Sequence, residues 1–542
     1  MEEEINENII INEANEIIDC DLIEKIFNSK VKKCVCKIKQ EIKIEDCLTL
    51  RTGTGFFCNI PSKDIKVLVT NNHVLDKEFL NKENKLTIFI EDEKKELNLE
   101  ITRLKITDKE FDFTIIEILE EDNISYFLEI DEYINTDDYA NEQIFSFQYP
   151  GGFKLKYSHG KIIKKSGKYF IYSLGTDGGS SGSPIILVDR LKLIGLHKGK
   201  YDLEKKNEMG LGIPMNVIIN KINYIKCIYN VKEKNADKEI QILNNGFNDL
   251  TGFNKKNEEI ESNIKIILDK EIRDCFFKYN FKKEGKFKVY FIQEKELTNM
   301  SYMFNKCQDI EEINLLPFST NIANNMTHMF NGCSLIKEIN LSSFRTKNVV
   351  DMSHMFAGCS SLKIIDLSSF NTNNVTKMAW MFSACSALNE INISTFDTAN
   401  VNDMGGMFSG CSSLKEINLS SFNTTKVTDM QCMFGGCSSL KEINLSSFNT
   451  INLTNIGCMF CGCSSLKEIN LSTFNIEKLT DIGSLFYGCS SLKQINISSF
   501  NTKNKILICN MFKGISSSSS LICDDPTIIE KFSETQSKCN IF

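Results

Sequence analysis

The sequence predicts two regions of different fold: an all-β region in the first half and an α/β array of stacked repeats in the second. Three observations lead to this prediction. The length of 542 residues allows several domains at roughly 100–200 residues each. Short strand-like segments separated by Gly, Asn and Asp turns fill residues 31 to 225. From about residue 300 onward, one sequence unit recurs every 26 residues.

The second region is defined by its period. Cysteines stand 26 residues apart at Cys307, Cys333, Cys359, Cys385, Cys411, Cys437, Cys463 and Cys489. Phenylalanines keep the same step at Phe304, Phe330, Phe356, Phe382, Phe408, Phe434, Phe460, Phe486 and Phe512. A fixed period of this length is typical of stacked repeats, in which each unit buries its apolar face against its neighbours.

Within one unit, two hydrophobic spacings follow each other. Leu414, Ile417 and Leu419 have the L-x-x-L-x-L spacing of leucine-rich repeats, with Ile417 and Leu419 on one side of a short strand. Apolar residues over 427–437 then fall at positions i, i+3, i+7 and i+10, which predicts a short helix. Gly436 can supply a left-handed turn at its end.

The repeat resembles the BspA-like leucine-rich repeats, a type also found in mycoplasma surface proteins, over about residues 300 to 515. Phenylalanine stands where the general leucine-rich pattern usually has Asn or Cys after the strand, so we expect a phenylalanine spine instead of a buried amide ladder. These residues are Phe344, Phe370, Phe396, Phe422, Phe448, Phe474 and Phe500. Ala384 replaces the usual glycine of one unit, which predicts strain in that turn.

Two polar columns of the array allow alternative interpretations. The repeated cysteines could be metal ligands, but one thiol per unit among apolar neighbours favours a small buried wedge. Cys432, Cys458 and Cys461 fall outside this register and are expected at the surface. The column Asn314, Asn340, Asp366, Asn392, Asn418, Asn444, Asn470 and Asn496 is either a self-satisfying amide ladder or a polar face for a protein partner.

The first region contains the residues that acyl transfer requires. A strand-like run from Leu68 leads to His73, Asp112 opens an apolar segment, and Ser181 lies in a Gly-Ser run. A serine hydroxyl needs a base, histidine suits that role, and a carboxylate can hold the imidazole tautomer. Each segment alone is also typical of a packed histidine, a turn aspartate or a loop. Their order and combination favour a catalytic site.

These segments resemble the chymotrypsin-like serine peptidases over about 190 residues. The matching motifs are Gly53-Thr54-Gly55-Phe56-Phe57, Thr70-Asn71-Asn72-His73-Val74, Asp112-Phe113-Thr114, Gly179-Ser180-Ser181-Gly182-Ser183-Pro184 and Ile194-Gly195-Leu196-His197. The resemblance implies two antiparallel β-barrels with the site between them. It also implies that His73 is the general base, Asp112 its orienter and Ser181 the nucleophile, and that the N–H groups of Gly179 and Ser181 form the oxyanion hole.

The closer resemblance is to bacterial glutamyl endopeptidases. It implies that Thr176 and His197 hold an acidic P1 side chain, because a hydroxyl and a neutral or cationic imidazole can donate to a carboxylate. The alternative is that His197 only packs in the pocket wall. Ser180 stands where the animal digestive enzymes have Asp, and no Ile-Val-Gly-Gly activation sequence precedes the domain. We therefore expect the site to form without zymogen activation.

Composition excludes several other classes. A net charge of −8 argues against a general nucleic-acid binder, and no run approaches the ~18 apolar residues of a membrane span. The acidic N-terminus does not resemble an export signal, so the 21 cysteines predict reduced thiols and a cytoplasmic location. A zinc site at Cys34 and Cys36 with Cys20 and Cys47 is the weaker alternative to packed thiols. We expect no metal and no cofactor.

The sequence therefore divides into segments with separate expectations. They are an acidic tail and helix (1–30, the helix near 16–28), a peptidase-like domain (31–228), a linker (229–262), an N-terminal cap (263–299), the repeats (300–515) and a C-terminal cap (516–542). We expect a serine endopeptidase acting on protein or peptide substrates, with a repeat array that binds a protein partner on its strand face. The alternatives are an inactive protease-like scaffold and a leucine-rich-repeat interaction or adhesion protein.

Overall fold

In a computed structural model the chain forms two compact units that divide after Lys221, except that residues 62–64 group with the second unit. The structure describes residues 30–44, 47–63, 65–82, 85–99, 103–131, 139–166, 168–174, 180–203, 207–244, 246–248, 254–269, 271–502 and 507–539. The expected acidic tail and its helix lie outside these residues.

The first half of unit one is an eight-stranded sheet in the order β5-β4-β1-β2-β3-β7-β6, with β8 paired to β2. The strands are β1 (Val35–Ile44), β2 (Cys47–Ile60), β3 (Ile65–Thr70), β4 (Lys85–Ile90), β5 (Glu93–Asn98), β6 (Lys105–Asp108), β7 (Phe113–Glu117) and β8 (Leu128–Glu129), with helix α2 at Lys77–Lys82. All five residues of β7 are buried, as expected for a strand held between two neighbours and covered on both faces.

The second half of unit one is a closed barrel in the order β10-β11-β14-β13-β12-β9. Its strands are β9 (Gln143–Gln148), β10 (Lys156–Ser166), β11 (Tyr169–Leu174), β12 (Pro184–Leu187), β13 (Leu193–Leu203) and β14 (Asn207–Pro214), followed by helix α3 (Met215–Asn220). The all-β prediction is confirmed for this half. The expected double barrel differs in one respect, since the first sheet is not closed by hydrogen bonds among the described strands.

Unit two opens with a five-stranded sheet in the order β20-β19-β22-β15-β23. Its strands are β15 (Tyr224–Val231), β19 (Ile264–Leu268), β20 (Glu271–Arg273), β22 (Gly285–Gln293) and β23 (Ile310–Asn314). Smaller elements are the pairs β16 (Glu239–Gln241) with β21 (Lys278–Asn280) and β17 (Gly246–Asn248) with β18 (Asn254–Lys256), and helix α4 (Glu258–Asn263). The sequence assigned β15 to the peptidase-like domain and the linker. The strand instead pairs with β22 and β23 along its length.

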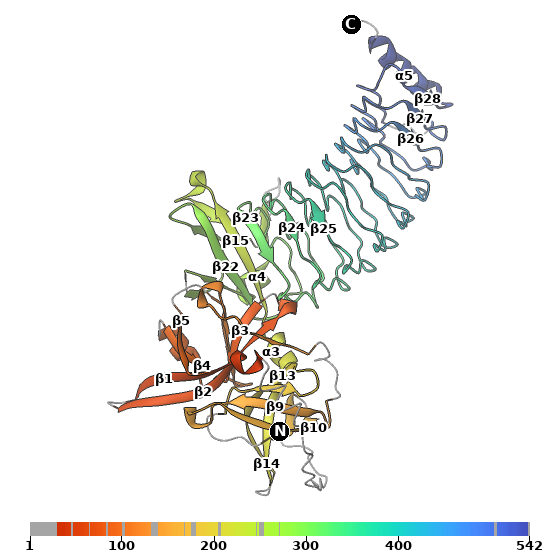
Figure 1. Ribbon diagram of the computed structural model, residues 1–542. Coiled ribbons are helices and arrows are strands. Elements are labelled where there is room, and N and C mark those ends of the chain that lie inside the picture. The colour runs from red at the N-terminus through yellow and green to blue at the C-terminus, as the bar shows by residue number, and fades with distance from the viewer. Residues whose placement is uncertain are drawn as a thin grey trace. The chain divides into compact units, whose positions relative to one another are not determined.

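The repeats stack as parallel coils between β23 and helix α5 (Pro526–Cys539), and Figure 1 shows them side by side. Short parallel strands join neighbouring coils at β24 (Glu338–Ile339), β25 (Ile364–Ile365), β26 (Glu468–Asn470), β27 (Gln494–Asn496) and β28 (Ser520–Ile522). A second line of bridges links residues 26 positions apart, for example Asp403, Asp429 and Asn455. The 26-residue period is therefore the length of one coil.

The helix expected over residues 427–437 is wrong. Alternate N–H groups from Met430 to Gly436 donate to carbonyls of the next coil at 2.6–3.0 Å. Of those between them, Met433 and Gly435 donate to the carbonyl three residues earlier, and Gln431 donates to the Asp429 side chain. Cys432 and Gly436 have φ angles of 55° and 75°, and left-handed residues interrupt an α-helix. The apolar spacing arises from successive turns and not from a helical face.

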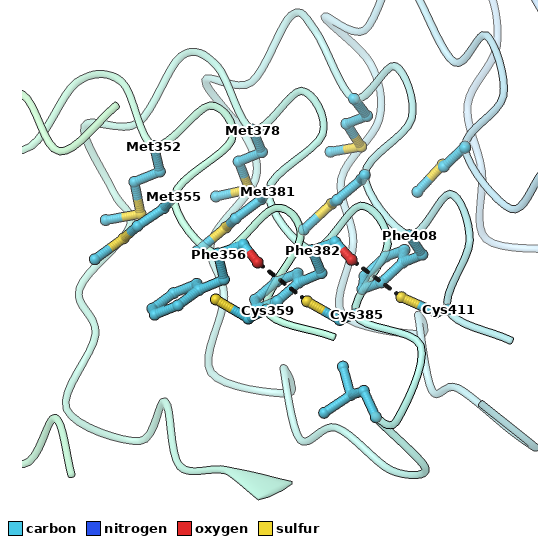
Figure 2. Close-up of a cluster of buried hydrophobic side chains, with 14 of the residues drawn as sticks. Met352, Met355, Phe356, Cys359, Met378, Met381, Phe382, Cys385, Phe408 and Cys411 are labelled. Atoms are coloured by element: carbon cyan, nitrogen blue, oxygen red, sulfur yellow. Dashed lines mark hydrogen bonds between the residues drawn. The ribbon is translucent and has the colours of Figure 1, made fainter. Parts of the chain in front are cut away.

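The core of the array consists of columns of identical side chains. Figure 2 shows Phe356, Phe382 and Phe408 stacked in successive coils, with ring centroids 5.6–5.8 Å apart. The thiol of Cys385 donates to the carbonyl of Phe356 at 3.2 Å, and the other thiols of this register from Cys333 to Cys489 make equivalent bonds. The buried-wedge interpretation of the repeated cysteines is thus confirmed. The second column, Phe344 to Phe500, is also buried, as the expected spine requires.

The asparagine column caps its own turns. The side-chain oxygen of Asn418 accepts the N–H of Ser420 at 3.0 Å, and the same bond recurs at the other positions of the column. Each amide oxygen is therefore used within its own coil, not in a ladder between coils. At the C-terminal end, Asp525 caps α5 by accepting the N–H groups of Thr527 and Ile528. No helix among the described residues is both long and apolar enough to cross a membrane.

Candidate active site

His73 lies in a tight turn directly after β3. The N–H groups of Val74 and Leu75 both donate to the carbonyl of Asn71 at 3.1 Å, and the two apolar side chains are buried beneath the turn. The imidazole points away from this anchor and is about half exposed, at 52%. The local sequence therefore places an accessible base on a rigid support.

Asp112 holds that imidazole in one orientation. Its Oδ2 lies 2.7 Å from Nδ1 of His73, and its Oδ1 accepts the backbone N–H of the same residue at 3.0 Å. Asp112 has a left-handed φ of 58°, and the side chain of Asn71 donates to its carbonyl at 2.7 Å. With Nδ1–H donated to the carboxylate, Nε2 is the ring nitrogen able to accept a proton.

Ser181 sits in a turn pressed against β2. Its carbonyl accepts the N–H of Thr54 at 3.0 Å. The next residue, Gly182, has a φ of 90°, and a Cβ there would lie 2.0 Å from the Thr54 carbonyl oxygen and 2.6 Å from the Thr70 hydroxyl. Thr70 is the last residue of β3, three before His73. The structure thus brings the serine turn to the strand end that carries the base.

The contacts among the predicted catalytic residues are unequal. His73 and Asp112 touch directly, whereas Ser181 Oγ forms no hydrogen bond with the imidazole in the described part of the chain. Such bonds are often long before substrate binds. The Ser181 N–H likewise donates to no described residue, so it can serve an oxyanion. Gly179 and Thr176 lie outside the described residues.

His197 is buried in β13 directly beside the serine turn. Its carbonyl accepts the N–H of Gly182 at 3.2 Å, and its own N–H donates to Ser183 at 2.8 Å. Its Nδ1 lies 2.5 Å from the hydroxyl of Tyr172 on β11. Burial, and secondarily the charge of His73, lowers the His197 pKa to about 4. The sequence left open whether this imidazole is neutral or cationic; with this pKa it is neutral at pH 7.

The partner hydroxyl fixes the tautomer of His197. Burial raises the pKa of Tyr172 far above its usual range, so this hydroxyl keeps its proton. Nδ1 of His197 is its only hydrogen-bond partner among the described residues, and a buried O–H is satisfied only by donating, so the hydroxyl donates to Nδ1. Nε2 then carries the imidazole proton. The sequence analysis missed Tyr172. The available signal was Gly210 and Gly212 on the paired strand, because a Cβ at either position would lie within 3.0 Å of the tyrosine ring.

A lysine follows the buried histidine. Lys198 Nζ reaches the hydroxyl of Tyr169 at 3.2 Å and the carbonyl of Glu110 at 3.4 Å, and it stands 4.8 Å from the Tyr169 ring centroid. No carboxylate lies within ion-pair distance of it among the described residues, whereas nearby Lys221 pairs with Asp108 at 3.0 Å. An unneutralised ammonium therefore lies beside the backbone of Glu110, the residue two positions before Asp112.

Of the thiols considered as a zinc site, Cys34 and Cys36 are buried at the start of β1. Burial raises the pKa of the Cys34 thiol to about 12 and that of Cys36 still further. Cys58 on β2 is buried as well, and Cys34 adds to the rise in its pKa. Cys20 and the Cys47 side chain lie outside the described part of the structure. No group of three or more metal-ligating side chains occurs among the described residues.

Comparisons with known proteins separate the two regions. Residues 53–196 match the family model of the trypsin-like peptidase domain. Residues 272–390, 298–419, 351–468 and 403–524 match the model described as "Mycoplasma protein of unknown function, DUF285". No curated protein matches the chain. The first unit thus carries a trypsin-like peptidase domain, and the repeats are similar to a family whose description gives no function.

Among solved structures, the chain is similar to the Rv3671c protease of Mycobacterium tuberculosis. The active form is 18% identical with a TM-score of 0.30, covering 40% of this chain and 90% of that chain. The inactive form is 18% identical with a TM-score of 0.27, covering 37% of this chain and 92% of that chain.

Proposed function

We propose that this protein is a serine endopeptidase in which Ser181, His73 and Asp112 hydrolyse peptide bonds through an acyl-enzyme. The observation that carries the proposal is the bond of 2.7 Å between His73 Nδ1 and Asp112 Oδ2, at the strand end against which the serine turn packs. A carboxylate–imidazole pair beside an accessible serine is the arrangement that makes an alcohol nucleophilic.

In this proposal the path of the proton follows from the tautomer of His73, which leaves Nε2 free to accept it. Ser181 Oγ attacks the peptide carbonyl while Nε2 of His73 accepts its proton, and Asp112 stabilises the imidazolium that forms. The oxyanion accepts the N–H of Ser181 and, as the family resemblance implies, that of Gly179. The imidazolium then protonates the leaving amine, and water releases the acyl group by the reverse sequence.

A fluorophosphonate probe tests this proposal, because it reacts only with an activated serine. We expect labelling of the full chain at Ser181 and its loss in Ser181→Ala. Ser158→Ala removes a hydroxyl from β10 of the same barrel and is the control. A folded wild type that is not labelled would favour the alternative of an inactive protease-like scaffold. The missing hydrogen bond between Ser181 and His73 gives that alternative its support.

We further propose cleavage after Glu or Asp. The neutral His197 presents Nε2–H, a donor that suits a substrate carboxylate, and Lys198 adds a positive charge without a carboxylate partner. Thr176 would complete the pocket, as the resemblance to glutamyl endopeptidases implies. Turnover of matched peptides with Glu, Asp, Lys or Leu at P1 tests this. We expect the Glu peptide to be turned over fastest and His197→Ala to abolish this preference. Faster turnover of the Lys or Leu peptide would contradict the proposed specificity.

We also propose that the coils are a leucine-rich-repeat solenoid that holds the protein substrate. Exposed charges of four coils line a groove of about 420 Å³, formed by Asn389, Glu390, Lys415, Glu416, Lys441, Glu442 and Lys467. The test is the double variant Lys415→Glu/Lys441→Glu. It should lower kcat/KM for a protein substrate but not for a short peptide, while Lys363→Glu, outside the groove, should change neither. Equal effects on both substrates would contradict the proposal.

The cytoplasmic location expected from the sequence is part of the same proposal. Fractionation of the source cells, with immunodetection of the protein, would test it.

A further inference from the structure

One column of the array has an unusual backbone and a changing side chain. Its members are Tyr302, His328, His354, Trp380, Gly406, Cys432, Cys458, Ser484 and Asn510, one in each coil, and all have φ angles between 53° and 65°. The rings of Tyr302, His328, His354 and Trp380 stack from coil to coil. Those of His328 and His354, for example, lie 4.3 Å apart at an interplanar angle of 14°. Side chains of this column can therefore meet across neighbouring coils.

Cys432 and Cys458 are adjacent members of this column. The N–H of Cys432 donates to Gly457 in the next coil at 2.9 Å, and that of Cys458 donates onward to Gly483 at 2.8 Å, so the two residues have the same local conformation. Both thiols are half-buried and free. The two thiols influence each other: burial and then the adjacent Cys458 thiol raise the pKa of Cys432 to about 12.

The spacing of the coils suits a covalent link at this point. Parallel neighbouring chains lie about 4.8 Å apart, and a disulfide requires a Cα separation of roughly 4.4–6.8 Å. The thiols of the buried register are differently placed, since Cys437 and Cys463 are fully enclosed and donate to Phe408 and Phe434. Among these four thiols, only Cys432 and Cys458 combine solvent access with equivalent positions in adjacent coils.

A third thiol stands next to the pair. Cys461 follows Cys458 by one turn, and its N–H donates to the Cys458 carbonyl at 3.0 Å. Burial, and secondarily the nearby Cys458 thiol, raise the pKa of Cys461. Cys461 is half-buried as well. A neighbouring thiol able to attack a disulfide makes that disulfide exchangeable.

We propose that Cys432 and Cys458 form a reversible disulfide that joins two neighbouring coils when the protein meets a soluble disulfide such as oxidised glutathione. One thiolate of the pair attacks a sulfur of the soluble disulfide and releases one thiolate from it. The second cysteine, on losing its proton, attacks the resulting mixed disulfide and releases the other. One S–S bond forms and one breaks, the soluble disulfide is reduced to two thiols, and the two cysteine protons pass to them.

The test uses the full chain treated with oxidised glutathione, followed by alkylation of the remaining thiols and digestion after lysine. Cleavage after Lys426, Lys441 and Lys467 puts Cys432 in fragment 427–441 and Cys458 in fragment 442–467. We expect a cross-linked pair of these fragments, about 2 Da lighter than their sum because two hydrogens are lost. Dithiothreitol should restore both fragments.

Serine variants locate the bond. Cys432→Ser and Cys458→Ser should each abolish the cross-link, while Cys461→Ser should keep it and slow its exchange with added thiol. Three outcomes would overturn the proposal: a bond between Cys437 and Cys463, a bond between Cys458 and Cys461 alone, or glutathione attached to Cys432 without a cross-link. Trp380 fluorescence should be unchanged on oxidation, which verifies that the array remains folded during the measurement.

Discussion

The hydroxyl of Tyr172 and Nδ1 of His197 lie 2.5 Å apart inside the closed barrel. This bond joins β11 to β13 and orients the imidazole beside the serine turn. Because the tyrosine donates, the histidine is fixed as the neutral tautomer with its proton on Nε2. A packing contact between two strands thereby sets the chemistry of a group that we place in the substrate pocket.

The burial of the His197 imidazole predicts a pH dependence of the free energy of unfolding. The His197 pKa is about 4 in the folded protein against 6.5 ordinarily. Between these values the unfolded chain binds a proton that the folded protein does not, so stability is full above about pH 6.5 and falls as pH drops toward 4. At 1.36 kcal/mol per pKa unit, the loss is at most about 3 kcal/mol.

His197→Gln should remove this part of the pH dependence. Urea unfolding followed by circular dichroism at pH 7 and pH 4.5 measures it. The only tryptophan, Trp380, lies in the second unit, so its fluorescence reports the unfolding of that unit. An unfolding transition seen by circular dichroism but not by fluorescence therefore belongs to the first unit. Parallel losses in the wild type and the variant would contradict the prediction.

Asp112→Asn should inactivate the enzyme without unfolding it. The amide cannot accept the Nδ1 proton as the carboxylate does, so the imidazole loses the tautomer that leaves Nε2 free. We expect a fall in kcat of about 10⁴-fold on a peptide substrate. Active-site titration provides the measurement, and a fall of less than tenfold would mean that Asp112 does not orient the base.

Gly182→Ala should displace the nucleophile. The new Cβ would lie 2.0 Å from the Thr54 carbonyl, and the φ of 90° is strained for alanine, so the turn must move. A shift of about 1 Å can cost 100-fold in rate, and we expect a loss of at least that size in fluorophosphonate labelling. Gly199→Ala is the control, since a Cβ there meets nothing within 4 Å. Similar labelling of both variants would contradict our account of the turn.

The sequence was informative about this site because its residues carry local signals. His73 follows a run of buried residues, Asp112 precedes another, and Ser181 is followed by a glycine that the turn requires. The Tyr172 contact could not be predicted, because it depends on how β11 pairs with β14 and closes the barrel. Strand pairing between distant segments leaves little trace in one sequence.

Ala384→Gly should stabilise the array. Ala384 has a left-handed φ of 57°, while the equivalent residue is glycine in the neighbouring coils, at Gly358 and Gly410. Glycine removes the strain of that conformation, so we expect a gain of about 1 kcal/mol. Urea unfolding followed by Trp380 fluorescence measures it within the same coil. Gly410→Ala should do the reverse, because its Cβ would lie 3.3 Å from the Ala384 Cα.

The array shows where periodicity misleads. A spacing of 26 residues fixed the coil length, and the buried columns of Cys and Phe followed from it. The helix over residues 427–437 failed because left-handed residues such as Cys432 send alternate N–H groups to the next coil. Nothing in the spacing of apolar residues distinguishes successive turns of this kind from a helix, since both bury a side chain every three or four residues.

Thr398→Val should weaken the array through its hydrogen bonds between coils. The Thr398 hydroxyl donates to the Asn423 carbonyl at 3.0 Å and accepts the Asn423 N–H at 2.8 Å, and the side chain is fully buried. Valine keeps the shape and leaves both backbone groups without a partner, which should cost about 2–4 kcal/mol. Thr425→Val, at an exposed position of the next coil, should change stability by less than about 0.5 kcal/mol. Urea unfolding followed by Trp380 fluorescence compares the two variants. Equal stability would mean that water replaces the lost hydroxyl, and that these bonds align the coils without holding them together.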